Sequence, residues 1–149
     1  MIEQLRKELE VDEGCVYSIY LDHLGYKTVG IGHLCRKGDP ERNMEVGTPV
    51  SEERVKELFD RDIAQTIEDC YKLIPDWDML PEEIQLICAN MCFNLGINRF
   101  GRFEKFFAAV ENRDWATAAD EMEDSKWHRQ DVPKRSGRLI VRMRKKAEK

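Results

Sequence analysis

The sequence predicts an α+β fold in which a small N-terminal lobe with a β-hairpin is joined by one long helix to a helical C-terminal lobe. Two observations lead to this fold class. Residues 16–31 combine β-branched and aromatic residues with turn residues between two short runs, as in a hairpin. From Ser51 onward the apolar residues instead recur at helical spacing. Strands followed by a run of helices are typical of the α+β class.

The lobes are expected to belong to one domain, because 149 residues fall within the usual size of about 100–200 residues. We place the small lobe at about 13–50, the linking helix at about 51–74 and the helical lobe at about 75–149. The helix at 2–11 precedes the hairpin and can pack with either lobe, and we group it with the helical lobe. A cleft between two lobes is a natural ligand site.

The small lobe is predicted from short elements. Residues 2–11 form a helix with two leucines on one face, and residues 16–20 and 26–31 form strands around a turn at 22–25. Glycines and prolines mark irregular structure at 35–50.

The helical lobe is predicted from N-caps and apolar stripes. Ser51 is a good N-cap for a helix that runs to about Ile74. One carboxylate, Asp62, falls on the apolar stripe of this helix and therefore needs a partner. Further helices are expected at 82–94, which has almost no polar face, at 103–110, at 115–122, and from Pro133 onward.

Composition limits the classes of function. Hydrophobic residues make up 42% and charged residues 36%, and no apolar run approaches the roughly 20 residues that span a bilayer. We therefore expect a soluble globular protein without an anchor or secretory signal. The net charge is −5, yet residues 126–149 carry +8, which leaves −13 on the rest of the chain. This basic end indicates either an anionic partner or a solvated helix face.

The five cysteines are expected to be free thiols in a reducing cytosol, because their number is odd and no export signal precedes them. Cys88 and Cys92 lie four residues apart on a predicted helix, but no other ligand pair completes a metal site. We interpret them as buried core thiols. We expect neither a metal ion nor a cofactor.

Two carboxylates and a hydroxyl are the candidate catalytic groups. Glu13 follows the first helix, Asp22 lies in the hairpin turn, and Thr28 is on the second strand. A protonated acid can give its proton to a leaving oxygen while a carboxylate activates water, as in glycoside hydrolysis. The alternative is that both acids are merely solvated.

The residues around this set resemble the active-site segment of the T-even phage lysozyme family, the phage endolysin muramidases. The resemblance covers Glu13, eight residues, Asp22, five residues, Thr28 and then the run Gly-Ile-Gly-His-Leu ending at Leu34. It continues with Phe-Asn-Leu-Gly at 93–96, Ser-Lys-Trp at 125–127 and Pro-Lys-Arg-Ser-Gly-Arg at 133–138. These landmarks run in the family's order along the chain, and the first segment is the most specific.

The resemblance implies a lysozyme-like fold and hydrolysis of the β-1,4 bond between N-acetylmuramic acid and N-acetylglucosamine in bacterial peptidoglycan. Glu13 would be the general acid, Asp22 would orient the water or stabilise the cation-like sugar, and Thr28 would help hold the water. Family members are described as inverting, which needs roughly 6.5–9.5 Å between the two carboxyl groups.

The resemblance also implies further site residues. Gly32, Leu34, Phe93 and Asn94 would contact the glycan. For Gly32 and its neighbour Gly30 the alternative is relief of strand twist, and for Asn94 it is helix C-capping.

His33 would pair with Asp62 in a structural role. Arg135 would form a salt bridge with the acid, beside Arg138; the alternative for Arg135 is a surface charge.

By the same resemblance, an endolysin would accumulate in the host cytoplasm as a monomer, without membrane insertion, and reach the periplasmic wall once a holin opens the membrane. The alternative is a non-catalytic peptidoglycan-binding or particle-associated lysozyme-like module. A nucleic-acid partner is not expected, because no basic stripe interleaved with aromatic residues is present.

Overall fold

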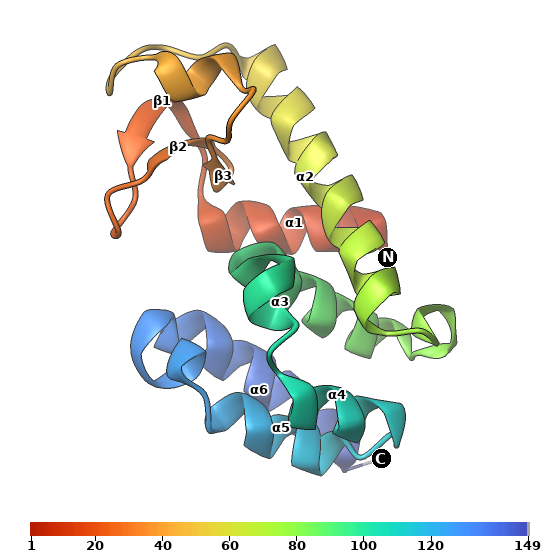
Figure 1. The fold of residues 1–149 in the computed structure, drawn as a ribbon. Helices are drawn as coiled ribbons and strands as arrows, with labels where there is room; N and C mark the ends of the chain where they lie inside the picture. The colour runs from red at the N-terminus through yellow and green to blue at the C-terminus, as the bar shows by residue number, and fades with distance from the viewer. Residues whose placement is uncertain (149) are drawn as a thin grey trace. The chain divides into compact units, whose positions relative to one another are not determined.

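The computed structural model describes residues 1–148 and confirms the α+β fold class (Figure 1). The chain divides into two compact units. Residues 2–65 form the N-terminal unit, and residue 1 together with the chain from residue 66 onward forms the C-terminal unit. The long helix α2 (Glu52–Leu73) begins in the first unit and continues into the second. The division of one domain into the lobes expected from the sequence, with the first helix in the helical lobe, stays a prediction.

The N-terminal unit contains one helix, a small sheet and the first half of α2. Its elements are α1 (Ile2–Glu13), β1 (Val16–Leu21), β2 (Lys27–Gly30), β3 (His33–Leu34) and the 3-10 turn η1 (Pro40–Asn43). The strands form an antiparallel sheet in the order β1-β2-β3. The expected hairpin is therefore present. The third strand was not expected, because two residues are too few to show an alternating pattern.

The segment 36–49 is irregular, as expected, but it is held in place along the free edge of β1. The backbone N–H of Ile19 donates to the carbonyl of Thr48 at 3.0 Å, and Val50 N–H donates to Tyr17 at 3.0 Å. Arg54 of α2 also donates two hydrogen bonds to the Glu41 carboxylate, from Nη2 to Oε1 at 2.9 Å and from Nε to Oε2 at 3.0 Å. This covers the strand edge and orders the loop.

A buried polar cluster of His33, Asp39 and Asp62 joins the sheet, the loop and α2. His33 Nδ1 lies 2.6 Å from Asp62 Oδ2, which confirms the expected pairing, and Nε2 lies 2.8 Å from Asp39 Oδ2. Burial lowers the pKa of His33, but the bonds and charges of the two carboxylates outweigh it, so the pKa is raised. Asp39 was missed because the loop sequence carries no recognisable motif.

Helix α2 begins where the sequence predicts. Ser51 Oγ accepts the backbone N–H of Arg54 at 3.1 Å, which is an N-cap bond. The expected apolar stripe is buried except for Ile67, which is half-buried. On the same helix, the ring of Phe59 lies 4.9 Å from the guanidinium carbon of Arg6 of α1. This contact ties α1 to the first half of α2.

The C-terminal unit is helical. Its elements after α2 are η2 (Trp77–Met79), α3 (Glu82–Phe100), α4 (Glu104–Glu111), α5 (Trp115–Glu123), the π-helical turn η3 (Trp127–Asp131) and α6 (Pro133–Ala147). The expected end of α3 at Asn94 is wrong. The helix continues to Gly96, where φ is 79° and ψ is 163°, and then makes a last turn to Phe100. A glycine adopts this backbone without a Cβ clash, so the helix bends there.

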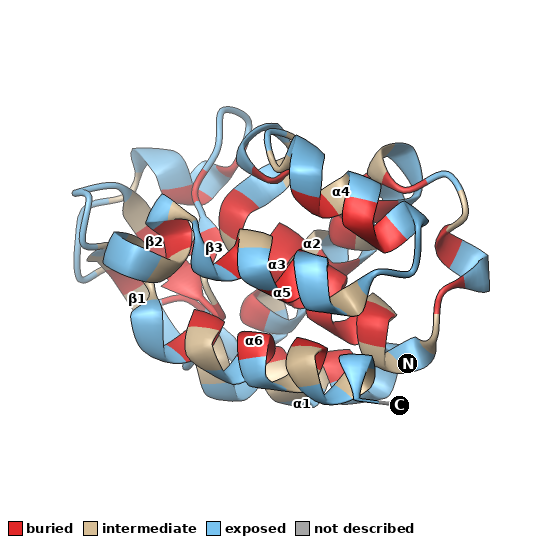
Figure 2. Cartoon of the chain, turned by 90° about the horizontal axis from the view of Figure 1, so that it is seen from below, coloured by how far each residue is buried: buried red, intermediate tan, exposed pale blue. Residues whose placement is uncertain are grey.

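The core of this unit is apolar around α3. Cys88 and Cys92 are buried on this helix, as expected, and Cys70 of α2 is buried as well. The ring of Phe100 packs edge-on against that of Phe107 with 4.9 Å between centroids. Figure 2 shows how buried and exposed residues alternate along α6, which presents one apolar face.

The basic end of the chain is partly neutralised by acids of its own unit. Arg142 of α6 makes two bonds to Glu83, and Arg144 contacts Asp120 and Glu123 of α5. The predicted charge asymmetry thus partly reflects ion pairs between helices. Within residues 1–148 no helix combines the length and apolar character needed to cross a bilayer.

Removing Asp62 from the buried cluster should destabilise the protein. We expect Asp62→Ala to lower the free energy of unfolding by about 1–3 kcal/mol, because it leaves a ring nitrogen of His33 without its partner. Asp60→Ala is the matched control on the same helix. It removes an exposed bond to Arg6 and should cost less than about 1 kcal/mol. Urea unfolding measures both, and equal losses would contradict a structural role for the cluster.

The same cluster predicts a pH dependence of stability. Since the pKa of His33 is raised in the folded protein, its contribution is full below about pH 6.5 and is lost as the pH rises through the folded value. The difference in free energy of unfolding between the wild type and His33→Gln should therefore shrink between about pH 6 and pH 9. Urea titrations across this range measure it. A difference that stays constant would refute the protonated cluster.

Candidate active site

Glu13 ends α1 and packs against the backbone of Gly32. Gly32 has a φ of +65°, and a Cβ built on it would lie 2.6 Å from Glu13 Oε1 and 2.8 Å from Cδ. Such distances are shorter than real carbon contacts, so any side chain at residue 32 would displace the Glu13 carboxyl from this position. Glu13 is half-buried in this position. The local backbone thus holds the predicted general acid at the start of the β2–β3 turn.

The two glycines of the Gly-Ile-Gly run make room for other side chains. A Cβ at Gly30 would lie 2.8 Å from Cγ1 of Val55 on α2, and one at Gly32 would meet Glu13. Gly30 therefore lets the sheet pack closely on α2. The Glu13 carboxyl lies where a side chain at residue 32 would be placed. A glycan contact at Gly32 stays a prediction.

Asp22 directs the hairpin turn. Its Oδ1 accepts the backbone N–H groups of Leu24 and Tyr26, each at 2.9 Å. Its own N–H donates to the Tyr26 carbonyl at 2.9 Å. Asp22 is half-buried, and among the described residues Oδ2 makes no hydrogen bond. One carboxylate oxygen is therefore structural, and the other is available for chemistry.

Thr28 is buried on β2 and is connected to the same turn. Its hydroxyl donates to the Tyr26 carbonyl at 3.0 Å. A hydroxyl whose hydrogen is already engaged in a hydrogen bond can still accept another hydrogen bond through its oxygen. Thr28 can therefore accept a hydrogen bond from a water but is not set to donate one to it. The structure joins Asp22 and Thr28 through the backbone of Tyr26.

Tyr20 is a site residue that the sequence interpretation missed. It lies on β1 directly opposite Thr28 in the sheet register. Burial, followed by the negative charges of Glu13 and Asp22, raises the pKa of the Tyr20 phenol. Both predicted catalytic acids are therefore close enough to act on one side chain. Strand alternation could have found it, because Tyr20 lies two residues before Asp22 on the same face.

Leu34, Phe93 and Asn94 are the other predicted glycan contacts, and this role stays a prediction. Leu34 is 43% exposed on β3 and lies opposite Thr28. In the C-terminal unit Phe93 and Asn94 are half-buried on α3. The amide oxygen of Asn94 accepts the indole N–H of Trp127 at 2.7 Å. C-capping by Asn94 is therefore wrong, since α3 does not end there, and the bond leaves its NH₂ group as a donor.

Arg135 lies inside the C-terminal unit. It is only 7% exposed, so the alternative of a surface charge is wrong, whereas Arg138 is exposed. Arg135 Nε donates to the side-chain oxygen of Asn90 at 2.9 Å, and Asn90 is fully buried on α3. Asn90 is thus a second missed residue, which its place within the apolar run from Leu86 to Phe93 could have signalled. The salt bridge from Arg135 to Glu13 stays a prediction.

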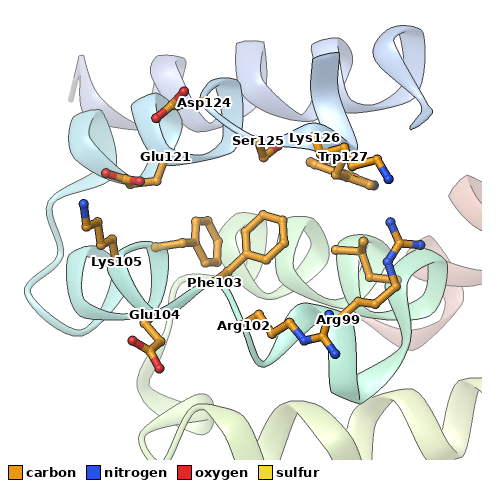
Figure 3. A pocket seen from close by; sticks show the side chains of 12 residues that line it. Arg99, Arg102, Phe103, Glu104, Lys105, Glu121, Asp124, Ser125, Lys126 and Trp127 are labelled. Atoms are coloured by element: carbon orange, nitrogen blue, oxygen red, sulfur yellow. The ribbon is translucent and has the colours of Figure 1, made fainter. Parts of the chain in front are cut away.

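A cavity of about 500 Å³ opens in the C-terminal unit between α3, α4 and α5 (Figure 3). The rings of Phe103 and Trp127 both line it and pack edge to face, with 6.3 Å between centroids and an interplanar angle of 80°. Arg102, Lys105 and Glu121 are among its charged lining residues. Aromatic walls and charges of both signs suit a ligand with apolar and ionic groups. Trp127 connects this cavity to Asn94.

The site chemistry therefore consists of acids, a hydroxyl and a phenol. Within residues 1–148 no three His, Cys, Asp or Glu side chains are grouped in a way that would hold a metal ion. One positioned carboxyl, a second carboxylate with one unbonded oxygen, and an accepting hydroxyl are the groups that acid/base hydrolysis requires.

Known proteins resemble this chain over most of its length. A model of the phage lysozyme family matches residues 10–148. The probable T4-type lysozymes 2 and 1 of Dictyostelium discoideum are each 31% identical to it, over 94% of this chain and 93% of each relative. The pre-baseplate central spike protein Gp5 of Enterobacteria phage T4 is 32% identical over 87% of this chain, which spans 25% of that protein. The chain therefore belongs to the phage lysozyme family, and with it to the lysozyme-type glycoside hydrolases.

Proposed function

We propose that this enzyme hydrolyses the β-1,4 bond between N-acetylmuramic acid and N-acetylglucosamine in bacterial peptidoglycan, with Glu13 as general acid and Asp22 as the group that activates water. The observation that carries the proposal is the fit of the Glu13 carboxyl into the space that Gly32 leaves open. A solvated surface acid needs no such space. Family membership supports peptidoglycan as the substrate class.

In the proposed reaction Glu13 gives its proton to the glycosidic oxygen as the bond to the sugar carbon C1 breaks. A water that donates hydrogen bonds to Asp22 Oδ2 and to the Thr28 hydroxyl oxygen adds to C1, and one of its protons passes to Asp22. Solvent then returns the proton to Glu13. Asp22 releases its proton to solvent, so both acids end in their starting states, and the products are a new reducing end and a free hydroxyl.

The proposed glycan contacts are Leu34, Phe93 and Asn94. Leu34 offers exposed apolar surface beside Thr28, and Phe93 offers an aromatic face of the kind that packs on sugar rings. The Asn94 NH₂ group is a donor suited to the carbonyl of an acetamido group, because its oxygen is already bonded to Trp127.

For the biological role we propose an endolysin that lyses the host cell. It would be made in the host cytoplasm as a monomer and would act on the periplasmic wall once a holin opens the membrane. One observation favours a second candidate, a particle-associated lysozyme module, since the chain resembles part of a central spike protein. The relatives in Dictyostelium discoideum show that the family is not confined to phages.

Replacing the proposed acid by its amide tests the chemistry. We expect Glu13→Gln to reduce the formation of new reducing ends from purified peptidoglycan by at least about a hundredfold, the usual scale for a lost general acid. Glu10→Gln is the matched control, because Glu10 is an exposed acid on the same helix, and it should keep full activity.

Two results would go against the assignment. Full activity of Glu13→Gln would remove Glu13 from the reaction. An equal loss in Glu10→Gln would mean that the effect comes from the helix rather than from the acid. Unfolding curves of both variants exclude a loss of fold.

The biological role is tested separately from the chemistry. We expect cells that express the chain in their cytoplasm to lyse when a holin is co-expressed and to stay intact without it. The Glu13→Gln variant with the holin is the control for membrane damage alone. If the purified enzyme cleaves peptidoglycan but the cells fail to lyse, the endolysin role is wrong and the particle-associated role is favoured.

A further inference from the structure

The hairpin turn is built around Asp22. The side chain accepts two backbone N–H groups through Oδ1, at 2.9 Å each. Its backbone carbonyl accepts the N–H of Gly25 at 3.0 Å, and its N–H donates to the Tyr26 carbonyl. Four hydrogen bonds of one short turn therefore converge on a single residue, which is more than a reversal of the chain requires.

These bonds give the two carboxylate oxygens different roles, because only Oδ1 accepts hydrogen bonds from the turn. Two donors fix the position of Oδ1, and a planar carboxylate with one fixed oxygen has little freedom left in its side-chain torsions. The direction of Oδ2 is therefore set by the turn. A catalytic group held in its productive direction before substrate binds avoids an entropic cost during the reaction.

Gly25 is the residue on which this turn depends. Its φ is +85°, in the left-handed region that other residues rarely adopt. A Cβ added to Gly25 would meet no atom within 4 Å. Glycine is therefore needed here for its backbone conformation and not for space, in contrast to Gly32. A side chain at this position would change the turn without creating a clash.

We infer that Gly25 is a positioning residue for the reaction, whose left-handed backbone sets the turn that aims Asp22 Oδ2 at the water. The inference rests on the proposed function, in which Asp22 activates that water. The inference goes beyond that function in one respect: the rate at which Asp22 activates the water depends on the backbone conformation of Gly25, which has no side chain.

A change at Gly25 should affect the rate more than the fold, because β1 is held without the turn. The strand pairs with β2 from Val16 to Leu21. Its other edge is bonded to the segment that ends at Val50. Loosening residues 22–26 therefore leaves both neighbours of β1 in place.

The experiment compares three glycine variants on soluble peptidoglycan fragments. We expect Gly25→Ala to lower kcat by about tenfold to a hundredfold, the scale for a misplaced catalytic group, and to leave KM nearly unchanged. Gly25→Asn should recover most of the lost kcat, because asparagine tolerates the left-handed region better than alanine. Gly47→Ala is the matched control, with a φ of +92° and no atom within 4 Å of its added Cβ. It should lower the melting temperature about as much as Gly25→Ala while keeping kcat.

The outcomes separate this inference from the proposed function. Asp22→Asn keeps an Oδ1 that can accept both N–H groups, so it should retain the melting temperature and lose at least about a hundredfold in kcat. If Asp22→Asn is fully active, the role proposed for Asp22 fails. If Asp22→Asn is inactive but Gly25→Ala has full kcat, or if Gly47→Ala loses as much kcat as Gly25→Ala, the positioning role of Gly25 alone is overturned.

Discussion

The contact between the Glu13 carboxyl and the backbone of Gly32 is the constraint on which the active site depends. It requires that α1 ends at residue 13 and that the chain turns between β2 and β3 with a positive φ. A side chain at residue 32 would crowd the Glu13 carboxyl and displace it. The acid and the glycine are nineteen residues apart, so this contact exists only where the sheet has formed. The reaction chemistry therefore depends on a contact between a side chain and a backbone.

Polar groups that are buried in pairs hold the frame around this contact. The His33, Asp39 and Asp62 cluster joins the sheet, the loop and α2, and Glu41 is gripped by Arg54 with only 3% of its surface exposed. Each of these groups would cost free energy if buried alone, so their pairing selects one arrangement of the loop. A segment without regular strands or long helices becomes a well-defined wall of the N-terminal unit in this way.

Charge has a similar structural role in the C-terminal unit. The basic residues of α6 and the acids of α3 and α5 attract each other, as in the bonds from Arg142 to Glu83 and from Arg144 to Asp120. Exposed pairs of this kind contribute little each, but they reduce repulsion within a strongly basic helix. The aromatic residues between the helices, including Phe103 and Trp127, then line a cavity and do not fill the whole space.

The sequence alone determined the order and type of the main elements. The apolar patterns of the hairpin and the helices extend over many residues, so a single residue that departs from a pattern does not hide it. It also indicated the residue types of the site through the spacing of Glu13, Asp22 and Thr28. It did not reveal β3, the continuation of α3 past Asn94, or the contributions of Tyr20 and Asp39. A two-residue strand has no period, and a helix break at Gly96 resembles an end. Only the tertiary structure decided which oxygen of Asp22 is committed to the turn and which glycine makes room for the acid, because those facts depend on distances between segments that a linear pattern does not encode.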